Sequence, residues 1–180
     1  VDQNVEEIRK LNHEITFISA SIAEMKSKET GQHLRRVSEF CYLICKFLGK
    51  DESECEKIKI ASVLHDIGKV GIPDTILNKP EKLTEHEWTI METHSKLGYD
   101  MLIDSEFESM QLAAKMALEH HERWDGAGYP NGKVGEEISL VGRICSVADV
   151  FDSLLDRRVY KQPWDEKSVK EYFEKMSGIQ

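Results

Sequence analysis

The sequence predicts an all-α protein, and three observations lead to this fold class. Apolar residues recur at spacings of three and four along most of the chain, and no segment shows the strict alternation of a half-buried strand. Neither a GxGxxG motif nor a Walker loop, which accompany parallel sheets, is present. The 180 residues, of which 40% are hydrophobic, are enough for one buried core. We therefore predict a helical bundle of about seven helices.

The first predicted element is an N-terminal linker helix over residues 1–28, which precedes a main domain over residues 29–180. Its apolar residues follow a 3,4,3,4,3 spacing: Ile8, Leu11, Ile15, Ile18, Ile22 and Met25. This heptad seam, with isoleucine at the a positions and leucine at the first d position, favours a parallel coiled coil and thus a homodimer. A single amphipathic helix packed on its own domain gives the same pattern. Because the pattern begins at once, we also expect an upstream segment that carries a signal.

The next two helices are bounded by turn and capping residues. One is expected from Gln32 onward, with Gly49 as its C-terminal cap. The following helix begins after Asp51 or Ser53, either of which can cap it, and runs through Leu64. The stretch GKVGIPDTILNKP then contains glycines and prolines that break helical structure.

Four further helices complete the predicted bundle. Thr84 and Glu87 form a capping box that opens one of them. Another covers residues 107–118 and leads into a histidine pair, after which WDGAGYPNGKVG is a loop. A helix over residues 140–155 follows, and Asp165 can cap the last one.

Composition excludes several classes of protein. The net charge of -9 disfavours binding to duplex nucleic acid. No apolar run approaches the roughly 18 to 20 residues of a membrane span, and the N-terminus lacks the apolar core of a signal peptide, so we expect a cytoplasmic protein. The cysteines form no CxxC pair and are interpreted as reduced, buried hydrophobes: Cys41, Cys45, Cys55 and Cys145.

Histidines and carboxylates give the clearest chemical signal. Five of the seven histidines lie beside carboxylates, at helix ends or in pairs: His33, His65, His94, His120 and His121. Glu29 precedes His33 by four residues, so on a helix the two share one face, and Asp66 follows His65 directly. Imidazole with carboxylate, without thiolate, is the ligand set of iron, manganese or zinc at hydrolytic sites. The sequence therefore predicts a transition-metal centre.

Five motifs in order carry a family resemblance: ETGQH, HDIGK, VGIPDTILNKP, HHERWDGAGYP and RICSVADVFD. Together they resemble the HD-GYP family of cyclic-dinucleotide phosphodiesterases, a branch of the metal-dependent HD phosphohydrolases, over about Glu29 to Trp164. The resemblance implies these metal ligands: His33, His65, Asp66, His94, His120, His121 and Asp149. Some members add a glutamate four residues before the first histidine, together with a third ion, and Glu29 stands there. We expect two or three divalent ions, iron or manganese, with the alternative that Glu29 merely ends the linker helix.

The resemblance also implies an activity. The expected substrate is cyclic di-GMP, opened to linear pGpG, with further hydrolysis to GMP left open. In this scheme a metal-bridging hydroxide attacks the phosphodiester. Asp66 bridges the ions and orients the nucleophile, and Lys69 stabilises the developing charge.

Substrate contacts are implied at two segments. In the GYP loop, Gly128, Tyr129 and Pro130 allow close backbone approach and offer a flat ring to guanine, although a structural turn beside the metal ligands is an equal alternative. Arg158 and Lys161 match a segment of the RPYK type, in which valine here replaces the usual proline. Their cations suit phosphate or guanine.

Two other functions stay open at this point. The first alternative is that the substrate is another cyclic dinucleotide, such as cyclic GMP-AMP, because these residues do not distinguish guanine from adenine. Alternatively the chain is a catalytically silent HD-GYP module that binds partners such as diguanylate cyclase domains.

Overall fold

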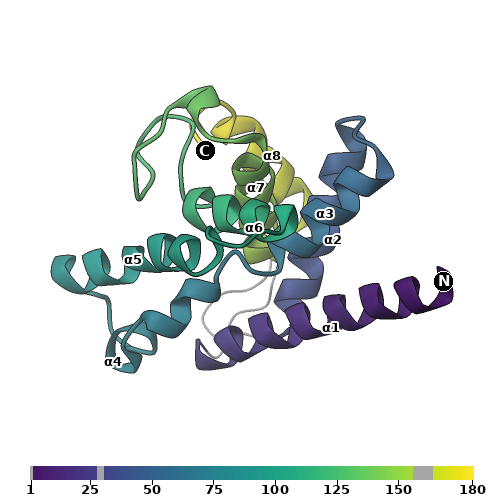
Figure 1. Cartoon of the computed structure of the whole chain (residues 1–180). Coiled ribbons are helices and arrows are strands. Elements are labelled where there is room, and N and C mark those ends of the chain that lie inside the picture. Colours follow the sequence, from purple (N-terminus) through teal and green to yellow (C-terminus); the bar gives the residue numbers. More distant parts are fainter. Residues whose placement is uncertain (1, 28–30, 156–163) are drawn as a thin grey trace.

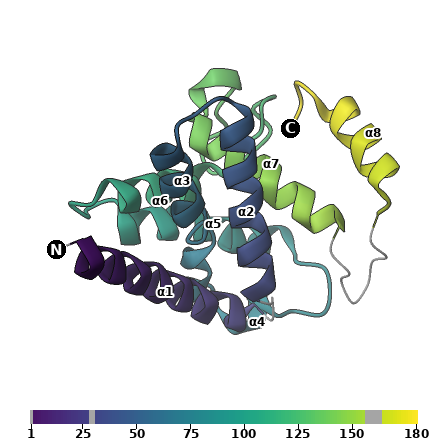
Figure 2. The same ribbon diagram turned by 90° about the vertical axis from the view of Figure 1, so that its right-hand side faces the viewer.

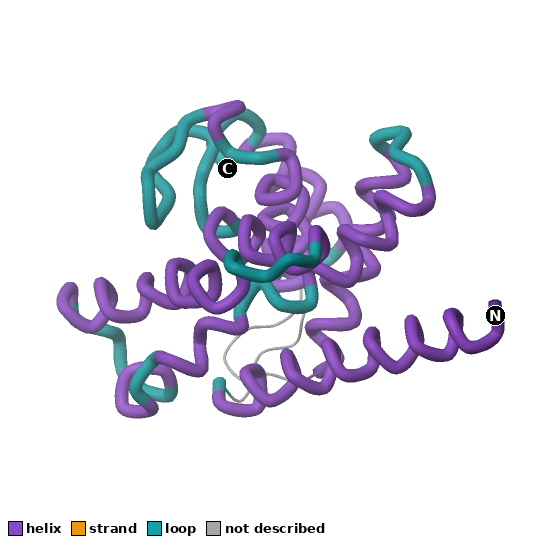
Figure 3. Tube along the Cα trace, viewed as in Figure 1, coloured by secondary structure: helices purple, strands orange, loops and turns teal. Residues whose placement is uncertain are grey.

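A computed structural model of the chain describes residues 2–27, 31–155 and 164–180, and within these ranges the fold is all-α. Figure 3 shows helices joined by loops, without a strand in the described ranges. Eight α-helices occur in these ranges: α1 Asp2–Lys26, α2 Gly31–Phe47, α3 Glu52–Ser62, α4 Asp74–Leu77, α5 Glu85–Leu102, α6 Glu108–Glu119, α7 Leu140–Leu155 and α8 Glu166–Met176. Two short 3-10 turns, η1 Ile67–Gly71 and η2 Gly135–Glu137, lie between them. The predicted helical bundle is confirmed.

Helix α2 stands at the centre of the bundle and packs against α3 and α7 (Figure 2). Its buried residues recur at helical spacing, among them Leu34, Val37, Cys41 and Cys45, so one continuous face enters the core. Helices α5 and α6 pack on each other, and α6 also contacts α3 and α7. These five helices carry, or directly precede, the five predicted ligand histidines and Asp149.

The predicted helix ends are found where the capping residues stand. Thr84 accepts a hydrogen bond from the Glu87 amide, and the Glu87 carboxylate accepts one from the Thr84 amide, which completes the capping box of α5. Asp51 accepts from the Glu54 amide and caps α3, and Asp165 accepts from the Ser168 amide and caps α8. Gly49, with a φ of 77°, follows α2.

The stretch after α3 is more helical than predicted. Helix α3 ends at Ser62, short of the predicted Leu64, and the 3-10 turn η1 follows. Helix α4 then forms a single turn after Pro73, whose carbonyl accepts from the amides of Ile76 and Leu77. The prolines and glycines shorten helices here but leave room for one turn, which is held because Ile76 is buried.

Helix α1 runs along the lower right of the bundle in Figure 1, and the side chains of its heptad seam are exposed. The seam residues are 52% to 76% exposed, whereas Ala20, Ala23 and Glu24 on another face are 1% to 2% exposed. A groove of about 990 Å³ separates the N-terminal half of α1 from the first turns of α3 and α6. Packing of the apolar stripe on the chain's own domain, one of the two interpretations of the pattern, is therefore wrong.

The four cysteines are buried with free thiols, as expected. The Sγ atoms of Cys45 and Cys55 lie 3.0 Å apart, and burial raises the pKa of the Cys45 thiol to about 12. None of the described helices combines the length and the apolar character needed to cross a membrane.

Candidate metal centre

The predicted ligands of the described residues come from distant segments and converge on one centre. His33 lies in the first turn of α2, His94 in the middle of α5, and Asp149 on α7. The ligand atoms fall into two clusters, each within 4.8 Å: Asp66, His94, His120 and His121 in cluster A, and His33, His65 and Asp149 in cluster B. Both clusters have the composition that divalent transition metals favour.

Asp66 lies between the two clusters. Its Oδ1 is 3.3 Å from Nε2 of His94 and 3.5 Å from Nε2 of His120. Its Oδ2 is 3.4 Å from Nε2 of His65 in cluster B. One carboxylate therefore presents one oxygen to each cluster, which is the geometry a bridging ligand needs.

Backbone carbonyls fix the tautomers of three histidines. Nδ1–H of His65 donates to the Ser62 carbonyl at 2.8 Å, and that of His94 donates to the Met91 carbonyl at 2.7 Å. The Nδ1–H of His120 faces carbonyls of the preceding turn at 3.0 and 3.1 Å. Because a carbonyl can only accept, Nδ1 carries a proton, and Nε2 of each ring points into the centre.

Asp152 supports His33 in the same manner. Its Oδ2 accepts from Nδ1 of His33 at 2.7 Å, and the carboxylate also accepts from Arg36 at 2.5 and 3.0 Å. Burial raises the pKa of Asp152, but hydrogen bonds from His33 and Arg36 outweigh it, and the net pKa is lowered. Asp152 was not predicted from the sequence, although its position one helical turn after Asp149 was a usable signal.

The buried polar atoms of the centre fit a cation. Nε2 of His65 and Oδ1 of Asp66 are buried without a hydrogen-bond partner among the described residues. Nε2 of His94 and Nε2 of His120 lie 3.5 Å apart, although both carry lone pairs. Donor atoms that face one another in this way are satisfied by divalent metal ions, and the centre is compatible with binding them.

Burial and the Asp66 charge shift the pKa values of the histidines in the centre. Burial lowers the pKa of His120. Burial also lowers the pKa of His121, and the neighbouring His120 lowers it further. Both imidazoles therefore stay neutral and able to bind a metal. Burial would also lower the pKa of His65, but the Asp66 charge outweighs it and raises that pKa to about 10. The Asp66 carboxylate therefore favours positive charge on the His65 side of the centre, whereas burial disfavours protonation of His120 and His121.

Lys69 lies beside Asp66 on η1. Its Nζ is 2.6 Å from Oδ2 of Asp66. The turn approaches α5 closely at Gly68, where a Cβ would stand 2.0 Å from the His94 carbonyl oxygen. Only glycine allows this contact, which brings the lysine segment against the helix that carries His94.

The GYP loop folds back on the histidine pair. A Cβ at Gly128 would lie 2.3 Å from the Arg123 amide, so the loop backbone needs glycine here. The Tyr129 ring stacks on His121 with centroids 4.7 Å apart and an angle of 28°. Glu122, 2% exposed, accepts from two loop amides and so fixes the loop. The Tyr129 ring thus covers His121, a predicted metal ligand, and the anchoring role of Glu122 was not predicted from the sequence.

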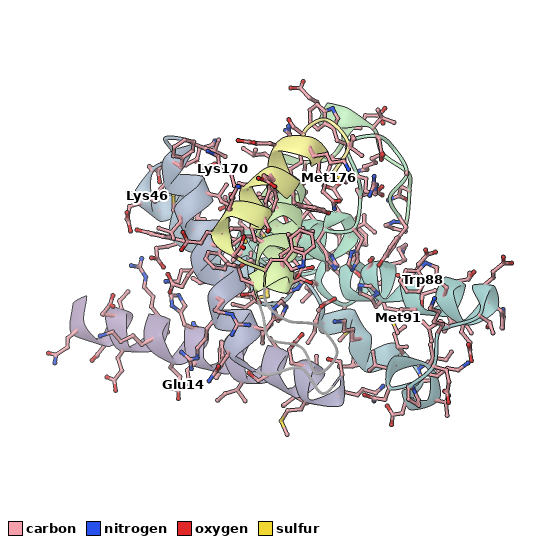
Figure 4. The ribbon with its side chains drawn as sticks, turned by 180° about the vertical axis from the view of Figure 1, so that it is seen from behind. Glu14, Lys46, Trp88, Met91, Lys170 and Met176 are labelled. Carbon is pink, nitrogen blue, oxygen red and sulfur yellow. The ribbon has the colours of Figure 1, made fainter. Side chains whose placement is uncertain are left out.

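A cavity of about 480 Å³ opens over cluster A. It is bounded by α5, the GYP loop, α7 and the C-terminal residues, and Figure 4 labels Trp88 on its α5 side. The lining includes His120, His121, Asp149, Tyr129, Trp88 and Glu92. Pro130 is exposed at the surface of the loop. Glu29, Arg158 and Lys161 lie outside the described residues.

Sequence comparison finds relatives that match most of the chain. The chain is 45% identical over 165 residues to the 3'3'-cGAMP-specific phosphodiesterase 2 of Vibrio cholerae, which covers 92% of this chain and 32% of that protein. It is 44% identical to the cyclic di-GMP phosphodiesterase response regulator RpfG of Xanthomonas campestris, over 89% of this chain and 43% of that protein. A cyclic di-GMP phosphodiesterase of Thermotoga maritima is 42% identical, over 92% and 44%. The chain spans less than half the length of these relatives.

Solved structures share the fold. A cyclic GMP-AMP specific phosphodiesterase of V. cholerae, V-cGAP3, superposes with a TM-score of 0.67 at 19% identity, over 93% of this chain and 45% of that one. The HD domain of L. monocytogenes PgpH gives 0.61 at 12% identity, over 90% and 81%. The resemblance noted in the sequence is confirmed, and the profile of the HD domain family matches residues 18–179. The chain therefore belongs to the HD domain family.

Proposed function

We propose that this chain is a metal-dependent phosphodiesterase that hydrolyses cyclic di-GMP to linear pGpG, with GMP as a further product. The observation that carries the proposal is Asp66, which offers one oxygen to each of two histidine clusters and lies 2.6 Å from the Lys69 ammonium. Relatives at 42% and 44% identity are named cyclic di-GMP phosphodiesterases. We assign the activity to residues 29–180, with residues 1–28 as linker.

The proposed ligands are the residues of clusters A and B, with Glu29 as an added ligand for a third ion. Iron or manganese suits nitrogen and oxygen donors without thiolate. When bound, such ions supply the charge that activates water and stabilises a phosphoryl group in transfer.

The chain's own residues supply orientation and charge. Asp66 holds the Lys69 ammonium beside the centre, where it can offset charge that develops on phosphate oxygens. Tyr129 and the backbone at Gly128 wall the cavity in which a nucleotide can lie. Arg158 and Lys161 are proposed as further contacts to phosphate or guanine.

A second substrate has specific support. The relative at 45% identity is named a 3'3'-cGAMP-specific phosphodiesterase. Cyclic GMP-AMP is therefore the alternative substrate, and a silent module that binds diguanylate cyclase domains is the non-enzymatic alternative.

The test is a substrate panel on protein loaded with iron or manganese. Cyclic di-GMP, 3'3'-cGAMP and cyclic di-AMP are incubated separately, and products are resolved by chromatography. We expect pGpG from cyclic di-GMP, with His33→Ala inactive and His13→Ala, an exposed position on α1, unchanged. Failure of the loaded wild type to cleave any of the three would contradict the proposal and favour the silent module.

We further propose that the seam of α1 binds a second copy of the chain in a parallel coiled coil. Its spacing is that of a heptad, and the residues are exposed while another face of the helix meets the domain. Replacement of both Ile15 and Ile18 by glutamate should give a monomer in analytical ultracentrifugation. Replacement of Lys10 and His13 by glutamate, at exposed positions on the face opposite the seam, is the matched control.

A further inference from the structure

The last turn of α1 is built into the domain, although most of the helix stands away from it. Ala23 and Glu24 are each 1% exposed, whereas Met25, next along the chain, is 76% exposed. Helix α1 packs against η1, the turn that directly follows Asp66. The end of the linker helix thus comes close to the metal centre.

Lys26 ties this turn to the segment that follows Lys69. Its Nζ donates to the carbonyl oxygens of Val70 at 2.7 Å and Ile72 at 2.6 Å. Its own carbonyl accepts from the Asn78 side chain at 2.9 Å. The residue is therefore bound to residues 70–78 by its side chain and by its backbone.

The Val70 carbonyl needs a donor from elsewhere. In a 3-10 turn the Val70 carbonyl would accept from the amide three residues later, but that residue is Pro73, which has no N–H. A cation at the C-terminal end of a helical turn also interacts favourably with its dipole. Lys26 thus acts as the cap of η1.

The turn is held from its other side by α5. Gly68 lies against the His94 carbonyl, and a Cβ at Gly71 would stand 2.8 Å from the Leu97 side chain. Lys69 lies between these glycines and between the two contacts. The Ile72 amide donates to the Lys69 carbonyl, so movement of residue 72 is passed directly to Lys69.

We infer that Lys26 is a positioning residue, which sets the place of Lys69 beside Asp66 and makes that place depend on the linker helix. The inference rests on the proposed function of Lys69. A slide of α1 by a single residue is about 1.5 Å, enough to break bonds of 2.6 and 2.7 Å. A second copy on the seam, or a signal carried by α1, would reach the reaction through this lysine.

The test uses Lys26→Met, which keeps the length of the side chain but loses the donors. Lys26→Arg is the rescue variant, and Lys10→Met is the matched control, since Lys10 is 77% exposed on the same helix. We expect Lys26→Met to lower kcat by roughly 10- to 100-fold, as displaced catalytic groups do, with metal content and KM little changed. Lys26→Arg should restore most of the rate.

A double variant separates positioning from general damage. Lys26→Met combined with Lys69→Met should be no slower than Lys69→Met alone, because both act through one ammonium. Multiplied effects, or a Lys26→Met rate equal to that of Lys10→Met, would overturn the inference.

Hydrogen exchange gives a readout that does not depend on turnover. Amides of residues 67–72 should exchange faster in Lys26→Met than in Lys10→Met, at equal melting temperature. If wild type hydrolyses no cyclic dinucleotide, the proposed function fails, but unchanged exchange in this segment would still be needed to reject the Lys26 tie.

Discussion

At the scale of single residues, the centre depends on groups that serve two neighbours at once. Asp66 faces both clusters and Lys69, and Asp152 joins His33 to Arg36. Loss of such a group leaves several buried partners unsatisfied together, which costs more than one hydrogen bond.

Asp66→Asn tests the shared ligand. The amide keeps the size of the side chain but loses the charge that attracts cations to both clusters. We expect hydrolysis to fall below detection and metal content to fall in both sites, with the helical circular dichroism spectrum retained. Near-normal turnover with metal still bound would show that Asp66 is not a ligand.

Asp152→Asn tests the supporting residue. The neutral amide is a weaker acceptor for Nδ1–H of His33, so the basicity of the ring falls. Metal affinity should drop by roughly 10- to 100-fold, measured by competition with a chromophoric chelator. An unchanged affinity would restrict Asp152 to the ion pair with Arg36.

At the scale of helices, the caps decide where the ligand-bearing segments start. Thr84→Ala removes the cap of α5, the helix that carries His94. The free energy of unfolding should fall by about 1 kcal/mol, measured in urea. The substitution Thr89→Ala, at an exposed position inside the same helix, is the control and should cost less.

Glu87 adds a pH dependence to this cap. Hydrogen bonds from Lys79 and Thr84 lower its pKa from 4.5 to about 2. A lowered carboxyl pKa stabilises the fold above the unfolded value, and that contribution is lost as pH falls from about 4.5 toward 2. The difference in melting temperature between wild type and Glu87→Gln should therefore be largest above pH 5 and shrink toward pH 2. A constant difference would argue against the ion pair with Lys79.

The sequence predicted where helices begin and end better than it predicted what packs against them. Caps at Thr84 and Asp165 were readable because they act within four residues. The orientation of α1 was not readable, because periodicity shows which residues share a face but not what covers that face. The turn η1 was missed for a similar reason, since it is held by Lys26 and α5, which are distant in sequence.

Some residues of the candidate site were predicted from the sequence and others were not. Motif order predicted the seven residues of clusters A and B as ligands, and the fold brings the side chains of each cluster together. Asp152 and Glu122 were overlooked, because the groups that they hold lie well apart from them in the sequence. Their roles appear only when Arg36, His33 and the loop amides are seen around them.

At the scale of the whole molecule, the metal centre links α2, α5, α6, α7 and the end of α3, so its occupancy should control global stability. Ions that bind the folded chain alone stabilise it by mass action. Removal of metal with EDTA should abolish hydrolysis and lower the melting temperature, and manganese should restore both. Calcium, which prefers more oxygen ligands, is the control and should restore neither. An unchanged melting temperature would mean that the clusters hold no ion in solution.

The carbonyls that hold His65, His94 and His120 have a consequence for mutagenesis. They belong to Ser62, Met91 and the turn before His120, and no side-chain replacement can delete a backbone oxygen. Alanine scanning will therefore pass over these three supports as silent positions, while Asp152, the carboxylate counterpart, registers. Backbone carbonyls orient three of the five imidazoles, so any sequence that keeps this backbone keeps their orientation.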